Sequence, residues 1–342
     1  LPVNSLKRLL LSFLVCAFMA SACFYAVLWE PEPFTITQII AADDRMGYIK
    51  DGLLFAGALS EASAGGQSGG YLEYFRNVPL AVEMEDVSAA AFGKQHTLAA
   101  TKDGTLYAWG DNRYGQLGTN STESADEPAA VMKGVAAVAA GSWSSYALTE
   151  SGELYAWGYD LYGQLGLGGG RLFRAKPGLV LKGVAAVDAA YSAVFALTET
   201  GELFAWGRNR YGQLGTGDIA DRSAPVRVAE GVVSFSCGGY HSLIQKEDGF
   251  VYGAGLNADG QLGVYTDEKY QTAFTRIGKF AAFDTGRTHS VFADGSGALY
   301  ASGQPAWDWG YLTKKPGPDS PLVMLTFDVF DATAGNGYTL IR

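Results

Sequence analysis

Gly152-Glu-Leu-Tyr-Ala-Trp-Gly158 is one of five closely similar heptapeptides that decide the fold of this chain. The other four are Gly104-Thr-Leu-Tyr-Ala-Trp-Gly110, Gly201-Glu-Leu-Phe-Ala-Trp-Gly207, Gly249-Phe-Val-Tyr-Gly-Ala-Gly255 and Gly297-Ala-Leu-Tyr-Ala-Ser-Gly303. Their opening glycines are 48, 49, 48 and 48 residues apart, and a degenerate copy, Gly52-Leu-Leu-Phe-Ala-Gly57, begins 52 residues before the first. A period of this size indicates a repeat architecture in which each unit is one supersecondary element.

A turn-forming residue precedes each opening glycine, and the pair predicts a β-hairpin turn because glycine tolerates positive φ. These residues are Asp103, Ser151, Thr200, Asp248 and Ser296. The strand after the turn, Leu-Tyr-Ala-Trp in its fullest form, is apolar on both alternating faces, so we expect another sheet to cover each side. Stacked blades provide that environment, and the predicted fold class is therefore an all-β propeller.

Two further motifs share the same period. The first ends the strand after each hairpin: Tyr114-Gly-Gln-Leu-Gly118, Tyr162-Gly-Gln-Leu-Gly166, Tyr211-Gly-Gln-Leu-Gly215 and the variant Asp259-Gly-Gln-Leu-Gly263. The second is a loop of the form G-x-x-H upstream of each hairpin: Gly93-Lys-Gln-His96, Gly141-Ser-Trp-Ser144, Ala190-Tyr-Ser-Ala193, Gly238-Gly-Tyr-His241, Gly286-Arg-Thr-His289 and Gly335-Asn-Gly-Tyr338.

These tandem units resemble the repeats of the regulator of chromosome condensation (RCC1-type) family of β-propellers, over residues 35–342. The resemblance implies a propeller of seven blades, which is usual in the family. The chain itself has six hairpin motifs and six G-x-x-H loops, so we expect six blades, with seven as the alternative if residues 35–50 add strands. We also expect the strand within Phe327–Ile341 to pair with Leu53–Ala56 and close the ring, which would remove exposed edges.

Composition narrows the classes of partner. The 342 residues include 45 glycines and 18% charged residues, with a net charge of −10, which suits short strands and tight turns. A negative surface repels phosphates, so nucleic acid is not an expected partner. Three cysteines, Cys16, Cys23 and Cys237, do not form a disulfide framework.

The N-terminal region predicts a membrane-directed segment. Residues 1–8 are a short basic N-terminus containing Lys7 and Arg8, residues 9–29 are uncharged, and residues 30–34 form a linker. A helix over residues 9–29 would span about 30 Å, the thickness of a bilayer core. The basic pair before it predicts a transmembrane anchor that places the propeller outside the cytoplasm. The alternatives are a signal peptide cleaved after Ala20-Ser21-Ala22, giving a secreted protein, and a lipoprotein acylated at Cys23.

Comparison of the repeats separates scaffold positions from variable ones. The histidines His96, His241 and His289 share one register, which favours a structural hydrogen-bonding role over a metal site, and no cofactor is expected. The tryptophans Trp109, Trp157 and Trp206 are predicted to pack between blades. In the other three blades Gly57, Ala254 and Ser302 occupy that position, so that either neighbours refill the space or a cleft opens.

The variable positions lie inside the G-x-x-H loops, which we expect at one end of the ring. Aromatic residues and arginine carry most of the binding energy of protein interfaces. The predicted binding face therefore comprises Gln95, Trp143, Tyr191, Tyr240, Arg287 and Asn336, with Trp307 and Trp309 of an insertion in the last blade as a second candidate contact region. The alternative for the aromatics is packing against neighbouring loops.

Three functions compete. The leading hypothesis is a non-enzymatic module that binds a protein of the cell envelope. The resemblance supports it by analogy, because some bacterial members of the family are secreted inhibitors that cap penicillin-recognising enzymes through aromatic loop residues. A cell-wall or carbohydrate-binding propeller using Trp307 and Trp309 is the alternative. A six-bladed glycosidase-type enzyme is disfavoured, because the arginines share no register and no catalytic motif occurs.

Overall fold

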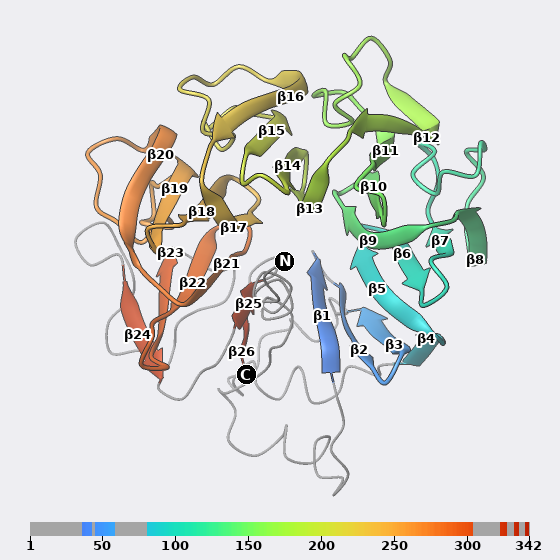
Figure 1. The fold of residues 1–342 in the computed structure, drawn as a ribbon, viewed down its shortest axis with the longest axis horizontal. Coiled ribbons are helices and arrows are strands. Elements are labelled where there is room, and N and C mark those ends of the chain that lie inside the picture. The colour runs from blue at the N-terminus through green and yellow to red at the C-terminus, as the bar shows by residue number, and fades with distance from the viewer. Residues whose placement is uncertain are drawn as a thin grey trace, which may run out of the picture.

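The computed structural model describes residues 36–42, 45–58, 81–303, 322–326, 332–334 and 339–341. All regular elements in these ranges are β-strands, and they form six four-stranded antiparallel sheets and one two-stranded sheet (Figure 1). In each four-stranded blade the strands follow one another in chain order, with the first strand next to the centre of the ring. The all-β propeller predicted from the repeats is confirmed.

The strands have the following bounds. The first blade contains β1 (Ile36–Ala42), β2 (Arg45–Lys50), β3 (Leu53–Ala58) and β4 (Ala81–Met84). The second contains β5 (Val87–Phe92), β6 (His96–Thr101), β7 (Leu106–Gly110) and β8 (Ala125–Met132), and the third β9 (Val135–Ala140), β10 (Ser144–Thr149), β11 (Leu154–Tyr159) and β12 (Phe173–Leu181). The fourth contains β13 (Val184–Ala190), β14 (Ala193–Thr198), β15 (Leu203–Gly207) and β16 (Arg222–Ala229). The fifth contains β17 (Val232–Cys237), β18 (His241–Lys246), β19 (Phe250–Leu256) and β20 (Tyr270–Lys279), and the sixth β21 (Ala282–Thr285), β22 (His289–Ala293), β23 (Leu299–Gly303) and β24 (Val323–Thr326).

The ring is closed differently from the prediction. The two-stranded sheet of β25 (Ala332–Ala334) and β26 (Thr339–Ile341) lies between the sixth and first blades, with β25 against β21, β22 and β1 (Figure 1). The expected pairing of the C-terminal strand with Leu53–Ala56 is wrong, because β3 pairs with β2 on one side and β4 on the other. Residues 36–50 add two strands to that same blade, so a two-stranded sheet occupies the seventh place.

The hairpin turns form at the glycines predicted from the sequence. Gly104, Gly152 and Gly201 have φ values of 79°, 75° and 81°, which L side chains rarely adopt. Their carbonyl oxygens accept hydrogen bonds from the first strand of the following blade, at 2.9–3.0 Å from the nitrogens of Val135, Val184 and Val232. Each turn therefore also joins neighbouring blades.

The G-Q-L-G segments receive a side chain from the next blade. Trp157 and Trp206 are fully buried, and their indole nitrogens donate to the carbonyl oxygens of Gln116 and Gln164 at 2.9 Å. A Cβ atom added at Gly118 would lie 2.7 Å from the Trp157 nitrogen, so the ring fits only against glycine. The predicted burial of Trp109, Trp157 and Trp206 is confirmed.

Two of the blades without this tryptophan fill the space with phenylalanine. Phe274 of β20 lies against Gly215, and Phe292 of β22 lies against Gly263. Ser302 replaces the indole as donor in the sixth blade, with its Oγ 2.9 Å from the Gln261 carbonyl oxygen. At these two junctions neighbouring side chains refill the space, which answers the alternative left open by the sequence.

The repeated histidines connect neighbouring blades. The Nε2 atom of His96 lies 3.0 Å from the Oγ of Ser145, which itself donates to the Gln116 carbonyl oxygen at 2.7 Å. Since the serine proton is used there, His96 Nε2 carries the proton and donates. His241 and Ser290 repeat the contact at 2.7 Å. Burial lowers the pKa of His96 and His241 to about 3, so both are neutral, and the predicted hydrogen-bonding role is confirmed for these two histidines.

Side chains of the innermost strands brace adjacent blades. The side-chain amide of Gln38 on β1 bonds both the nitrogen and the oxygen of Ala90 on β5, at 3.0 and 2.9 Å. Asp188 on β13 accepts a hydrogen bond from the Cys237 nitrogen on β17 at 2.8 Å. Burial, with a contribution from Asp284, raises the pKa of Asp188 to about 6.

Candidate functional site

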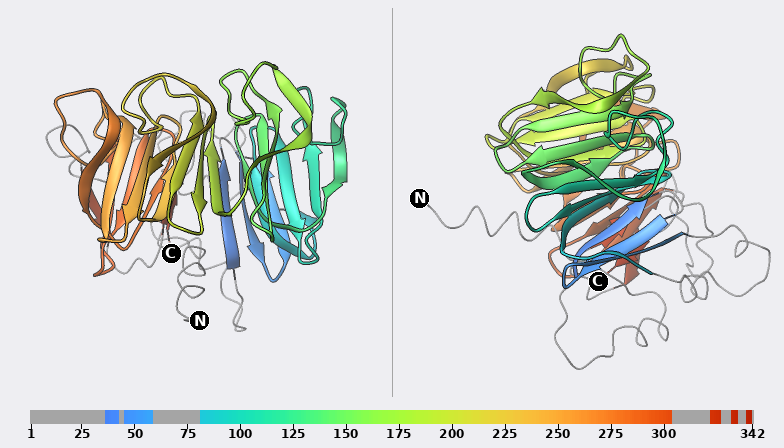
Figure 2. Two further views of the ribbon diagram at one scale, coloured as in Figure 1. Left: turned by 45° about the horizontal axis from the view of Figure 1, so that its top comes forward. Right: turned by 90° about the vertical axis from the view of Figure 1, so that its right-hand side faces the viewer.

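The G-x-x-H loops of the second to sixth blades lie at one end of the ring. Each joins the first and second strands of its blade, and the G-Q-L-G segments leave the third strands at the same end, whereas the hairpin turns lie at the opposite end (Figure 2). We call this end the loop face and define it as residues 93–95, 110–116, 141–143, 158–164, 190–192, 207–213, 238–240, 255–261 and 286–288. Gln95, Trp143, Tyr191, Tyr240 and Arg287 all belong to it.

Backbone hydrogen bonds hold neighbouring loops side by side. The Lys94 nitrogen donates to the Ser142 oxygen and the Ser142 nitrogen to the Tyr191 oxygen, both at 3.0 Å, and the Gly239 nitrogen donates to the Gly286 oxygen at 3.3 Å. Variable side chains from different blades are thus held at set positions, because the backbone that carries them is itself cross-linked.

Trp143 belongs to an aromatic cluster between the second and third blades. Its ring centroid lies 5.9 Å from those of Tyr114 and Tyr159, in edge-to-face geometry with both. The Nζ of Lys94 lies 5.5 Å from the indole centroid, within cation–π range. Trp143 is partly buried, so part of its side chain packs against neighbouring residues and part is exposed to solvent.

Tyr191 and Tyr240 belong to a second cluster, across the fourth to sixth blades. Their centroids are 6.0 Å apart, and Tyr211 packs edge-on against Tyr240 at 5.4 Å. The guanidinium of Arg287 lies 5.6 Å from the Tyr191 centroid and 5.7 Å from that of Tyr240, and donates to the Tyr240 hydroxyl at 3.1 Å. Gly239 leaves room for the Tyr191 ring, since a Cβ atom there would lie 3.1 Å from it.

Tyr191 itself has an unusual backbone conformation. Its φ is 55°, in the left-handed region that tyrosine rarely occupies. Such strain persists where the surrounding structure imposes it and is commonly found at functional sites. The backbone contact with Ser142 and the ring contact with Tyr240 hold this residue in place.

The sequence analysis missed the tyrosine of the Y-G-Q-L-G motif as part of this face. Tyr114 contacts Trp143, Tyr211 contacts Tyr240, and Tyr162 receives the guanidinium of Arg208 at 4.6 Å. In all three cases the partner is on the following blade. The repetition of a tyrosine before the glycine turn was a signal in the sequence that this residue contacts a partner. The partner itself could not be identified, because it is distant in sequence and comes close only when the blades pack into the propeller.

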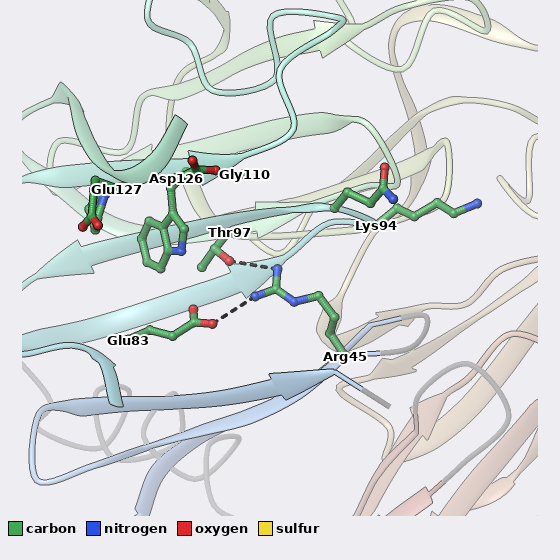
Figure 3. A pocket seen from close by; sticks show the side chains of 10 residues that line it. Arg45, Glu83, Lys94, Thr97, Gly110, Asp126 and Glu127 are labelled. Carbon is green, nitrogen blue, oxygen red and sulfur yellow. Dashed lines mark hydrogen bonds and ion pairs between the residues drawn. The ribbon is translucent and has the colours of Figure 1, made fainter. Parts of the chain in front are cut away.

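A groove of about 560 Å³ opens beside Gln95, between the first and second blades. Arg45 lies within it, donating to Thr97 Oγ1 at 2.9 Å and pairing with Glu83 Oε1 at 3.4 Å (Figure 3). Trp109 also lines it, and within the described ranges its indole nitrogen has no acceptor like those of Trp157 and Trp206. Of the residues that line this groove, repeat comparison predicted only Gln95 as a binding residue. Arg45 and Glu83 were not predicted, because they lie on first-blade strands without a repeat motif.

Some predicted features lie outside the described residues. These are Asn336, Trp307, Trp309 and the segment of residues 9–29. Within the ranges that the structure describes, no helix has the length and apolar character needed to cross a bilayer.

The strand topology and the two repeated loop types define the class of protein as a β-propeller of RCC1-type repeats. A family model described as the RCC1-like domain matches residues 26–292. The chain belongs to this RCC1-like domain family, as the resemblance of its repeats implied.

Individual relatives match to different extents. The RCC2 homolog of Danio rerio is 47% identical over 49 residues, which are 14% of this chain and only 10% of that protein's length. Human WBSCR16 superposes with a TM-score of 0.73 at 21% identity, covering 90% of this chain and 87% of that one. Prp20p of Saccharomyces cerevisiae superposes with a TM-score of 0.74 at 20% identity, covering 90% and 82%. At these identities the two solved structures establish a shared fold.

Proposed function

We propose that this protein is a non-enzymatic interaction module that binds another protein through its loop face. The observation that carries the proposal is the grouping of Trp143, Tyr191, Tyr240 and Arg287 at one end of the ring, each on a loop bonded to its neighbour. Rigid aromatics and arginine on a pre-organised surface are the usual anchors of protein interfaces, since little conformational entropy is lost on binding.

Relatives support binding as the general role. Propellers of the RCC1-like family are typical protein-interaction modules, and Prp20p has been described with its binding to Gsp1p and histones. The partner proposed here is different, because the apolar segment of residues 9–29 favours a membrane anchor with the propeller outside the cytoplasm. A protein of a bacterial cell envelope is the partner that this location favours.

The test is affinity capture with matched variants. The full chain in a non-ionic detergent is immobilised, exposed to an envelope extract, and the retained proteins are identified and titrated. Trp143→Ala and Tyr191→Ala are expected to weaken retention of the partner by roughly 30-fold or more, which corresponds to about 2 kcal/mol for an interface hot spot. Leu179→Ala, which alters an exposed apolar side chain on β12, is the control and should bind normally.

Two results would overturn the proposal. Retention of peptidoglycan or another glycan without any protein would support the carbohydrate-binding alternative. A protein partner whose retention is equal for both aromatic variants and for the control would exclude the loop face as the site.

A further inference from the structure

The loop face differs in charge from the rest of the chain. It carries the cations Lys94, Arg113, Arg208, Arg210 and Arg287, and the acids Asp111, Asp160 and Asp259. Asp160 is buried and accepts a hydrogen bond from the Leu165 nitrogen. In a chain with a net charge of −10, the residues of the loop face thus carry more cations than acids.

Three of the four arginines of this face, Arg208, Arg210 and Arg287, lie over tyrosine rings, whereas Arg113 pairs with Asp111 at 3.0 Å. Arg208 lies 4.6 Å from the ring centroid of Tyr162 and Arg210 lies 5.8 Å from that of Tyr211, and in the described part of the chain no carboxylate pairs with either guanidinium. Arg222 on the same blade differs, because it pairs with Asp218 at 2.7 Å. When the flat face of a guanidinium lies on an aromatic ring, the N–H donors at its edge can still bind a carboxylate, and this applies to Arg208 and Arg210.

Arg208, Arg210 and Arg287, with the tyrosines on which they stack, form one connected surface that we call the Arg-Tyr patch. The backbone nitrogen of Arg208 donates to the backbone oxygen of Ser192, the neighbour of Tyr191, at 2.8 Å. Arg287 contacts the rings of both Tyr191 and Tyr240. Tyr240 in turn packs on Tyr211, on which Arg210 lies. Arg208 and Arg210 are therefore carried by the fourth blade and Arg287 by the sixth, and Tyr240 of the fifth blade lies between them.

Acidic residues around the patch favour a short acidic segment over an extended polyanion as its partner. Acidic residues lie on the outer connections at the same end, including Asp218, Asp221, Asp267 and Glu268. An extended polyanion such as a nucleic acid would meet these charges and be repelled. A short segment bearing a few carboxylates can contact the arginines alone, through forked N–H···O bonds that suit carboxylate geometry.

We propose that the Arg-Tyr patch binds an acidic segment of the partner protein, with carboxylates on Arg208, Arg210 and Arg287 and neighbouring apolar atoms on the tyrosine rings. This inference rests on the proposed function and specifies the chemistry of its partner. It predicts that binding is steered by charge and weakens as salt screens the interaction.

The test uses the full chain and defined probes. The probe is a short fluorescein-labelled peptide of alternating glutamate and serine, the comparator has glutamine in place of glutamate, and a labelled oligothymidylate of equal charge tests the nucleic acid class. Binding is measured by fluorescence anisotropy at low and physiological salt. Arg208→Gln, Arg210→Gln and Arg287→Gln are compared with Arg222→Gln, which removes an arginine of the fourth blade outside the patch, and thermal unfolding verifies that each variant folds.

The glutamate peptide should bind at least tenfold more tightly than the glutamine peptide, and each patch variant should weaken it by roughly tenfold, as expected for a hydrogen bond to a charged group. Arg222→Gln should bind as the original chain does. Absence of binding, equal binding of the glutamine peptide, or tighter binding of the oligonucleotide would overturn the inference. If the arginine variants still capture an envelope protein that Trp143→Ala and Tyr191→Ala lose, the acidic class is wrong while the proposed function stands.

Discussion

The indole nitrogen of Trp157 donates a hydrogen bond to the carbonyl oxygen of Gln116 on the preceding blade, at 2.9 Å. The contact joins two repeats through a fully buried side chain, and Trp206 and Gln164 reproduce it one blade further on. The same G-Q-L-G segments begin with the glycine after the tyrosines of the loop face. The packing between blades therefore positions the candidate binding residues.

Replacing the indole should separate its two contributions. Trp206→Phe retains an aromatic ring but leaves the Gln164 carbonyl oxygen without the indole donor, and we expect it to lower the free energy of unfolding by about 1–3 kcal/mol. Trp206→Ala also leaves a cavity and should cost about 3–5 kcal/mol. Chemical denaturation measures both, and Trp143→Ala on the loop face is the comparison, with a smaller expected loss. Equal losses at positions 143 and 206 would contradict the inter-blade role.

The glycine that ends the G-Q-L-G segment is required for space as well as for conformation. Gly118 and Gly134 have nearly equal φ values, 75° and 73°, but a Cβ atom would meet the Trp157 ring only at Gly118 and nothing within 4 Å at Gly134. Gly134→Ala should cost about 1–2 kcal/mol, the cost of a left-handed L-residue. Gly118→Ala should cost clearly more in the same denaturation experiment, and equal costs would show that backbone conformation alone matters.

Acid should destabilise the propeller through its buried histidines. The pKa of His241 is about 3 in the folded chain, below the ordinary value of 6.5, so the unfolded chain binds a proton between these pH values and the folded chain does not. The stability that His241 contributes is thus present above pH 6.5 and is lost as the pH falls towards 3. His241→Gln keeps a donor for Ser290 and should reduce the slope of unfolding free energy against pH by up to about 1.4 kcal/mol per pH unit between pH 6 and 4. An unchanged slope would refute this assignment.

Asp188 should act in the opposite direction. Its folded pKa of about 6 lies above the ordinary value of 3.8, so its contribution is fully present below pH 3.8 and is lost as the pH rises through 6. Asp188→Asn keeps an oxygen to accept from the Cys237 nitrogen and carries no charge. We expect the variant to be more stable than the original by about 1–3 kcal/mol at pH 7.5 and equally stable near pH 3.5, as measured by urea denaturation. A variant that is less stable at pH 7.5 would contradict the prediction.

Repeat comparison predicted the blades well because each motif acts locally. An opening glycine such as Gly104 specifies a turn through its own φ, and an apolar strand such as β7 specifies burial on both faces. The predicted closure of the ring was wrong because strand pairing at the closure is not a local property. Pairing of the last strand depends on which edge is vacant, and β2 occupies the edge of β3 that was assigned to the C-terminal strand.

The candidate site was predicted in part. The end of the ring on which Trp143, Tyr191, Tyr240 and Arg287 lie was predictable, because these residues vary within a fixed register and register determines the end of the blade on which a residue lies. Their partners were not found. Tyr114 is 29 residues from Trp143 and Arg287 is 96 residues from Tyr191, and no local pattern encodes such pairs.

The amino-acid sequence by itself determined the repeat, its hairpins, the buried tryptophans and the end of the ring that carries the variable side chains, because turns and alternating strands follow from neighbouring residues. Only the tertiary structure decided how the ring closes, which blade supplies the partner of each tyrosine, and where arginines gather over tyrosine rings. Those relationships join residues of different blades, and their geometry exists only when the blades pack around a common centre.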